Sequence, residues 1–96
     1  MSARILLTQR RDQILAAAAR HGAADVRIIG SVARGEDDDR SDIDLLVKFE
    51  PGRSLLDHAA LIIELEELLG RKVDVASDDG LRPRVQARVI PEAIAL

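Results

Sequence analysis

The chain has 96 residues, the size of one domain, and 47% of them are hydrophobic, which is enough for a single core. It has no cysteine, which excludes disulfides, thiolate metal sites and a cysteine nucleophile and fits a cytoplasmic location. The formal net charge of -3 and the scattered arginines argue against direct binding of a polynucleotide, and no apolar run approaches the ~20 residues that span a membrane.

The first half of the chain predicts one helix, one strand and a helical turn. An Ala-rich stretch from about Thr8 to His21 favours a helix, and Gly22 stands where a helix commonly ends. Val26 to Ile29 is a β-branched run that predicts a strand. Residues 31 to 35 are expected to form one helical turn, and residues 36 to 41 a polar loop.

The middle of the chain predicts a strand followed by a long helix. Ile43 to Phe49 is the strand, which Pro51 and Gly52 end. Ser54 and Asp57 have the spacing of a capping box, so we expect a helix from there to about Leu69. We expect one side of this helix to be apolar, formed by Leu55, Ala59, Ile62, Ile63 and Leu69.

The last third completes the predicted fold. Lys72 to Ala76 reads as a third strand, Pro83 to Val89 as a short helix, and Ala93 to Leu96 as either an edge strand or frayed coil. The strand–helix–strand segment from 43 to 76 predicts a parallel, right-handed crossover. The order of elements predicts an α/β (α+β) fold, a small mixed sheet with helices packed on it, in a single domain over residues 1–96.

Gly30 and Ser31 follow the first predicted strand directly. Glycine lets the backbone approach a ligand closely, and Ser31 adds a hydroxyl at the start of a turn whose N–H groups are free to bind. Such a turn is suited to a phosphate.

Three aspartates are candidates for a metal site. Asp42 and Asp44 are two residues apart in a strand, so their carboxylates point to the same side. Their mutual repulsion favours a cation such as Mg²⁺, which binds carboxylates together with substrate phosphates. Asp74 lies in the next strand and completes a set that can hold two ions, with Asp74 also available as a base.

These motifs resemble the signature of the minimal nucleotidyltransferase family, within the DNA polymerase β-like superfamily. The family pattern is Gly-Ser, ten residues and Asp-x-Asp, and here residues 32 to 41 are those ten. The segment from Leu68 to Asp74 is similar to the family segment that carries the third carboxylate. The likeness extends over nearly the whole chain.

The resemblance implies a nucleotidyltransferase core that uses two Mg²⁺ ions and takes ATP as its substrate. Asp42, Asp44 and Asp74 would bind metal and carry catalysis, and Gly30 and Ser31 would position the phosphates. Members of the family often act as antitoxins of a HEPN-domain ribonuclease toxin, and some attach AMP to a tyrosine of that toxin. The resemblance therefore implies a HEPN partner protein. This chain has no tyrosine, so a tyrosine acceptor would belong to the partner.

Several alternatives stay open from the sequence. Arg34 either reaches a phosphate or braces the acidic loop through Glu36 or Asp38. The acidic run from Glu36 to Asp39 is expected to be a solvated loop. Arg71 and Lys72 are expected to be surface charges. A catalytically idle antitoxin that masks its toxin, or an enzyme that modifies a small molecule, are the rival functions.

Overall fold

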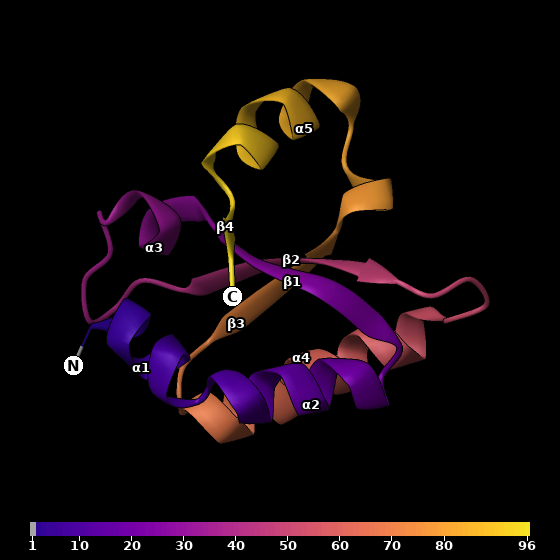
Figure 1. Cartoon of the computed structure of the whole chain (residues 1–96), viewed down its shortest axis with the longest axis horizontal. Helices are drawn as coiled ribbons and strands as arrows, with labels where there is room; N and C mark the ends of the chain where they lie inside the picture. Colours follow the sequence, from indigo (N-terminus) through magenta and orange to yellow (C-terminus); the bar gives the residue numbers. More distant parts are fainter. Residues whose placement is uncertain (1) are drawn as a thin grey trace.

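A computed structural model describes residues 2–96 as a four-stranded mixed sheet with helices (Figure 1). The order of strands across the sheet is β3-β2-β1-β4; β1 is antiparallel to both its neighbours, and β2 is parallel to β3. The elements are α1 (Ala3–Gln9), α2 (Arg11–Arg20), β1 (Ala23–Ile29), α3 (Gly30–Arg34), β2 (Ile43–Phe49), α4 (Leu55–Leu69), β3 (Val73–Ser77), η1 (Asp78–Gly80), α5 (Pro83–Val89), η2 (Ile90–Glu92) and β4 (Ile94–Ala95). The predicted fold class is confirmed.

The N-terminal segment differs from the single helix predicted from about residue 8. It forms two helices, α1 and α2, that meet at Arg10. The first begins earlier than predicted because the Ser2 hydroxyl accepts a hydrogen bond from the Ile5 N–H and caps it. The break lets each helix bury its own apolar side chains, Leu7 in α1 and Ile14 in α2.

Strand β1 is longer than predicted because pairing extends it. Ala23 and Ala24, which have little intrinsic preference for strands, pair with Phe49 and Lys48 of β2. The register shifts between Ala24 and Arg27, where Asp25 has a φ of 52°. This irregularity is a long-range feature that the local sequence does not predict.

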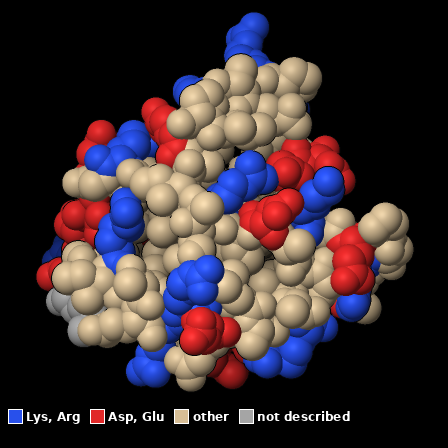
Figure 2. All heavy atoms as spheres, in the orientation of Figure 1, with Lys and Arg blue, Asp and Glu red and all other residues tan. Residues whose placement is uncertain are grey.

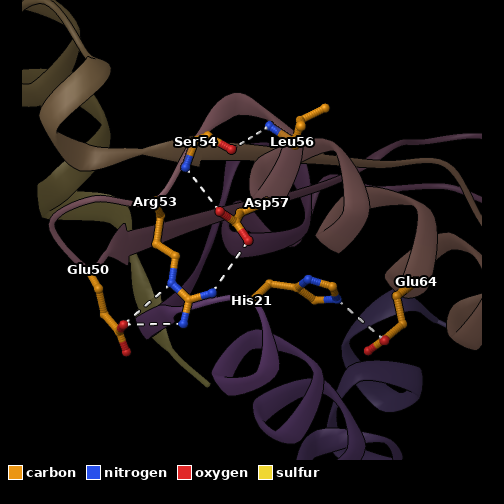
Figure 3. A network of polar contacts seen from close by, with 7 residues as sticks. All are labelled: His21, Glu50, Arg53, Ser54, Leu56, Asp57 and Glu64. Carbon is orange, nitrogen blue, oxygen red and sulfur yellow. Dashed lines mark hydrogen bonds and ion pairs between the residues drawn. The ribbon is translucent and has the colours of Figure 1, made fainter.

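Helix α4 follows its predicted signals. The Ser54 hydroxyl accepts from the Leu56 N–H, the Asp57 carboxylate accepts from the Ser54 N–H at 3.0 Å, and Gly70 ends the helix with a φ of 66°. Figure 3 shows this capping box beside Arg53, whose guanidinium lies between the carboxylates of Glu50 and Asp57. Arg53 is thus paired with two carboxylates at this end of the sheet.

The predicted apolar side of α4 was partly wrong. The buried stripe consists of Leu61, Leu65 and Leu69, which recur every four residues, whereas Leu55 is 84% exposed and Ile63 is 57% exposed. Ile63 lies two residues from Leu61, about 200° around the helix, so it faces away from the stripe. The stripe packs against the sheet with α2, and both helices lie on the same side of it in Figure 1.

Side chains along β2 and β3 point alternately to the core and to the opposite face of the sheet, which carries the candidate site. Ile43, Leu45 and Val47 enter the core beneath the helices, as do Val73 and Val75 of the neighbouring strand. The residues between them therefore point to the opposite face. This face carries Asp44 and Asp74, and α5 lies on the side of the sheet opposite α2 and α4 in Figure 1. None of the helices described in residues 2–96 combines the length and the apolar composition of a membrane-spanning segment.

Candidate active site

Asp44 and Asp74 occupy directly paired positions on neighbouring parallel strands. The register matches Asp44 of β2 with Asp74 of β3 on one side and with Ile29 of β1 on the other. Since paired residues of adjacent strands project to the same face, the two carboxylates stand side by side. Two residues that are thirty positions apart in the sequence are brought together by the parallel pairing of β2 and β3.

The surroundings of Asp44 disfavour its charged form. Burial raises the pKa of its carboxyl group, and the negative charges of Asp74 and then Asp42 raise this pKa further. Arg34 is near enough to oppose the effect but does not cancel it. A cation between these carboxylates would relieve the repulsion, so the electrostatics fit a positively charged ligand.

Asp42 lies just before β2 and is less constrained than Asp44. Its carboxylate forms an ion pair with the Lys72 ammonium group at 3.8 Å, in which the Asp42 side chain is 40% exposed. Such an exposed pair contributes little and is easily exchanged. Across the described part of the chain, no three acidic or histidine side chains are already gathered as a complete metal-ligand set. Asp42 would have to leave Lys72 to join the other two carboxylates.

Glycine is required at position 30 because the backbone there lies against the Asp44 carboxylate. Its φ is 72°, a conformation that side chains rarely adopt, and a Cβ added here would lie 2.5 Å from Oδ2 of Asp44. The backbone of the Gly-Ser turn therefore passes directly beside the carboxylate. The sequence indicated a close approach of this glycine to a ligand, and the structure adds its close approach to an acidic side chain.

A cavity of about 550 Å³ opens over these residues. Gly30, Asp44 and Asp74 line it, whereas Ser31 and Asp42 stand outside the lining. The wall opposite the sheet comes from α5 and η2 through Arg88, Val89 and Glu92. Figure 2 shows acidic and basic side chains interspersed on one face of the molecule, with groups of both signs meeting beneath α5. The volume is in the range of small-molecule sites.

Arg34 lines the cavity but already has two carboxylate partners. Its guanidinium donates to Glu36 at 3.2 Å and to Glu92 at 3.4 Å, and these two bonds raise its pKa. Of the two roles that the sequence left open, the structure shows bracing through Glu36. Glu92 is an unexpected third member that ties α3 to η2.

Sequence reasoning missed the residues that the C-terminal segment contributes. Arg88 and Glu92 have no motif or spacing that relates them to the aspartates, because the fold of α5 over the sheet brings them there. Arg71, expected to be a surface charge, instead donates hydrogen bonds to the backbone carbonyl groups of Asp38 and Ser41. The acidic run 36–39 is a largely exposed loop, as expected.

The donor set fits Mg²⁺. Asp42, Asp44 and Asp74 offer only carboxylate oxygens, the ligands that this hard cation prefers. Burial and the neighbouring aspartates raise the pKa of Asp44, an effect that a bound cation would oppose. Asp44 and Asp74 would hold such an ion, and Asp42 would join them. Substrate phosphates in the adjoining cavity would complete its coordination.

Comparisons with known proteins agree with this geometry. The family model described as a nucleotidyltransferase domain matches residues 11–95. The chain is 45% identical over 75 residues to a candidate protein adenylyltransferase of Methanocaldococcus jannaschii, covering 78% of this chain and 81% of that protein. It is 37% identical over 75 residues to the protein adenylyltransferase MntA of Thermococcus cleftensis, covering 78% and 76%.

Solved structures show the same fold. A structure described as a candidate minimal nucleotidyltransferase has 57% identity and a TM-score of 0.86, with 94% of this chain and 92% of the other covered. A toxin–antitoxin complex with AMP-PNP has a TM-score of 0.76 at 17% identity over 88% of this chain and 69% of that one, a likeness of fold alone. With its matched fold and family model, this chain belongs to the nucleotidyltransferase domain family and is an enzyme of that class.

Proposed function

We propose that this protein transfers AMP from ATP to a hydroxyl group of a partner protein, with Mg²⁺ as the cofactor. The observation that carries the proposal is the pair of Asp44 and Asp74 on adjacent strands, beside Gly30 and at the base of a cavity. The names of two similar proteins, one a protein adenylyltransferase and the other a candidate for this activity, support a protein as the acceptor. The fold shared with an AMP-PNP complex supports an adenine nucleotide as the substrate.

The chain's own residues account for positioning and proton transfer. The turn at Gly30 and Ser31 places the triphosphate over Asp44, and Asp74 is exposed to an incoming acceptor. The acceptor oxygen forms a bond to the α-phosphorus, the bond to the pyrophosphate oxygen breaks, and Asp74 takes the hydroxyl proton as pyrophosphate leaves. Bound Mg²⁺ supplies neutralisation of the negative charge on the carboxylates and phosphates.

The proposed partner is a HEPN-domain ribonuclease toxin, which this protein would neutralise as an antitoxin. Support comes from the likeness of fold to a chain of a toxin–antitoxin complex and from the resemblance of the Gly30 and Asp42 motifs to the minimal nucleotidyltransferases that accompany such toxins. Since this chain contains no tyrosine, a tyrosine that accepts AMP would lie on the toxin.

The test is transfer of AMP to the product of the adjacent reading frame, purified separately and incubated with ATP and Mg²⁺. Intact-mass spectrometry should show a gain of one or more AMP masses with the wild-type protein and none with Asp42→Ala. Asp37→Ala, which changes an acidic residue of the neighbouring loop, is the matched control and should remain active. Equal transfer by Asp42→Ala and the wild type would refute the assignment.

A second candidate is an idle antitoxin that masks its toxin by occlusion. The position of Asp42 favours it, since the carboxylate is paired with Lys72 and is not gathered with Asp44 and Asp74 in the described residues. Toxin neutralisation by Asp42→Ala separates the two functions. Neutralisation equal to that of the wild type indicates occlusion, whereas its loss, with the complex still formed, indicates that transfer is the means of neutralisation.

A further inference from the structure

Arg71 ties the loop before Asp42 to the start of β3. Its guanidinium Nη2 donates to the backbone carbonyl oxygen of Asp38 at 3.0 Å and to that of Ser41 at 2.5 Å. Both acceptors belong to loop 36–41, which connects α3 to β2 and is followed directly by Asp42. A single side chain thus bridges two segments that lie thirty residues apart.

The start of the loop is tied to α3, because the Glu36 N–H donates to the Ser31 carbonyl oxygen at 2.9 Å and the Arg34 guanidinium donates to the Glu36 carboxylate at 3.2 Å. The hydrogen bonds among residues 38–41 determine the shape of its other end. The Asp38 N–H donates to the Ser41 hydroxyl at 2.9 Å, and the Asp38 carboxylate accepts from the Arg40 N–H at 2.8 Å. These two bonds lie within residues 38–41, so this end of the loop could move as a unit without breaking them. Backbone hydrogen bonding to the neighbouring strand segment begins only at Ile43, whose N–H donates to the Lys72 carbonyl oxygen at 3.0 Å.

Within residues 2–96, two side-chain contacts join the end of this loop, residues 38–42, to the segment that leads into β3. One is the exposed ion pair of Asp42 with Lys72 at 3.8 Å, a weak tie. The other is the pair of hydrogen bonds from the half-buried Arg71, which are charge-assisted and partly shielded from water. Arg71 is therefore the principal attachment.

We propose that Arg71 is a positioning residue of the transfer site, which fixes the backbone that carries Asp42 at the start of β2, from where its carboxylate can turn from Lys72 to Asp44 and Asp74. The inference rests on the proposed function, since it concerns how that site is assembled. Arg71 stands three residues before Asp74, so the segment from 71 to 74 both supplies one carboxylate and locates another. Removing the guanidinium would leave Asp44 and Asp74 in register and release Asp42 alone.

The two hydrogen bonds of Arg71 depend on the shape of the guanidinium group as well as on its positive charge. The planar guanidinium presents several donors in a fixed fork and can serve two carbonyl oxygens at once, whereas the lysine ammonium is a point charge on a shorter stem. Arg71→Lys should therefore recover only part of the effect. Arg40→Ala is the matched control, because it removes the same charge from an exposed position in the loop whose side chain holds no carbonyl group in the described structure.

The first test measures hydrogen–deuterium exchange of the protein alone, without metal or nucleotide. In Arg71→Ala, the amides of residues 38–41 should exchange about tenfold faster, while those of the β2 core keep their protection. Arg40→Ala should resemble the wild type, and Arg71→Lys should lie between. Unchanged exchange of the loop in Arg71→Ala would overturn the inference. So would equal acceleration over loop and sheet in both Arg71 variants, since this marks a general loss of stability.

The second test measures AMP transfer as Mg²⁺ is varied. Residues that orient metal ligands typically change metal affinity or activity about 10–100-fold, so the Mg²⁺ concentration for half-maximal transfer should rise by that factor in Arg71→Ala. It should stay unchanged in Arg40→Ala. If the wild type transfers AMP and Arg71→Ala needs no more Mg²⁺, the inference fails and the function stands. If the wild type transfers nothing, the proposed function fails, and the exchange experiment still decides the role of Arg71 in holding the loop.

Discussion

The carboxylates near the two ends of strand β2 have pKa values shifted in opposite directions. Beyond its C-terminal end, Asp57 accepts a hydrogen bond from the Ser54 N–H and faces Arg53, and these contacts lower its pKa (Figure 3). Near its N-terminal end, burial and two neighbouring aspartates raise the pKa of Asp44. One carboxylate is stabilised as an anion, and the other is held where its charge is unfavourable.

The difference separates structure from function. The carboxylate of Asp57 is satisfied within the fold, and it serves to begin α4. Among the described residues, no donor comparable to the Ser54 N–H reaches the Asp44 carboxylate, and a Cβ at Gly30 would lie 2.5 Å from its Oδ2. A site that retains repulsion of this kind is expected to be completed by a ligand, here a cation.

The largest expected difference between the two carboxylates is in the rate of AMP transfer. Asp44→Asn keeps the size of the side chain but removes its charge, so AMP transfer should fall by on the order of 10³-fold. Asp57→Asn removes the same charge at the opposite end and should leave transfer within about twofold. Initial rates with ATP and Mg²⁺ measure both. Comparable losses in the two variants would mean that Asp44 has no special role.

The next effect is stabilisation by the metal. Mg²⁺ at about 100 times its Kd should add ~2.7 kcal/mol to the free energy of unfolding if it binds only the folded protein. Denaturant titration of the wild type and of Asp57→Asn should show this gain, and Asp44→Asn should not. A gain that persists in Asp44→Asn would place the ion elsewhere.

A smaller effect comes from the glycine beside Asp44. Gly30→Ala and Gly35→Ala both place a side chain at a φ of 72°, which costs about 1 kcal/mol in each. Only at residue 30 does the new Cβ meet Asp44, since nothing lies within 4 Å at residue 35. Thermal unfolding should therefore show a larger loss for Gly30→Ala, together with a loss of transfer that Gly35→Ala does not share. Equal behaviour of the two variants would contradict the close contact.

The smallest effect is the pH dependence of stability without metal. The raised pKa of Asp44 means that its contribution to stability is complete below the pKa of the unfolded chain, about 3.9, and is lost as the pH rises through the folded value. Asp44→Asn should thus be more stable than the wild type at neutral pH, and this advantage should vanish in acid.

The lowered pKa of Asp57 reverses the sign. Its contribution is present above the unfolded value and is lost as the pH falls through the folded one, so Asp57→Asn should be less stable than the wild type at neutral pH. Melting temperatures from pH 3 to pH 7 measure both variants. Shifts of the same sign would show that the two ends of β2 do not differ.

Local signals were sufficient for the elements around the site. The apolar run from Ile43 to Phe49 and the capping box at Ser54 predicted β2 and α4, because their causes lie within a few residues. The parallel pairing of β2 with β3 then brought Asp44 beside Asp74 as expected.

Features that depend on contacts between distant residues could not be predicted from the sequence. The break at Arg10 and the extension of β1 over Ala23 follow from packing and pairing, not from local preference. The contact of Arg34 with Glu92 spans 58 residues, and the place of Arg88 at the cavity depends on how the C-terminal segment folds back toward the sheet. None of these leaves a periodicity or a motif.

The most direct measurement is a crystal structure of this protein with Mn²⁺, which gives an anomalous signal, and a non-hydrolysable ATP analogue. We predict anomalous density between the carboxylates of Asp44 and Asp74, with Asp42 turned away from Lys72 to join them and the phosphates beside Gly30. An ion and nucleotide bound at another place, with these three carboxylates unliganded, would contradict the account.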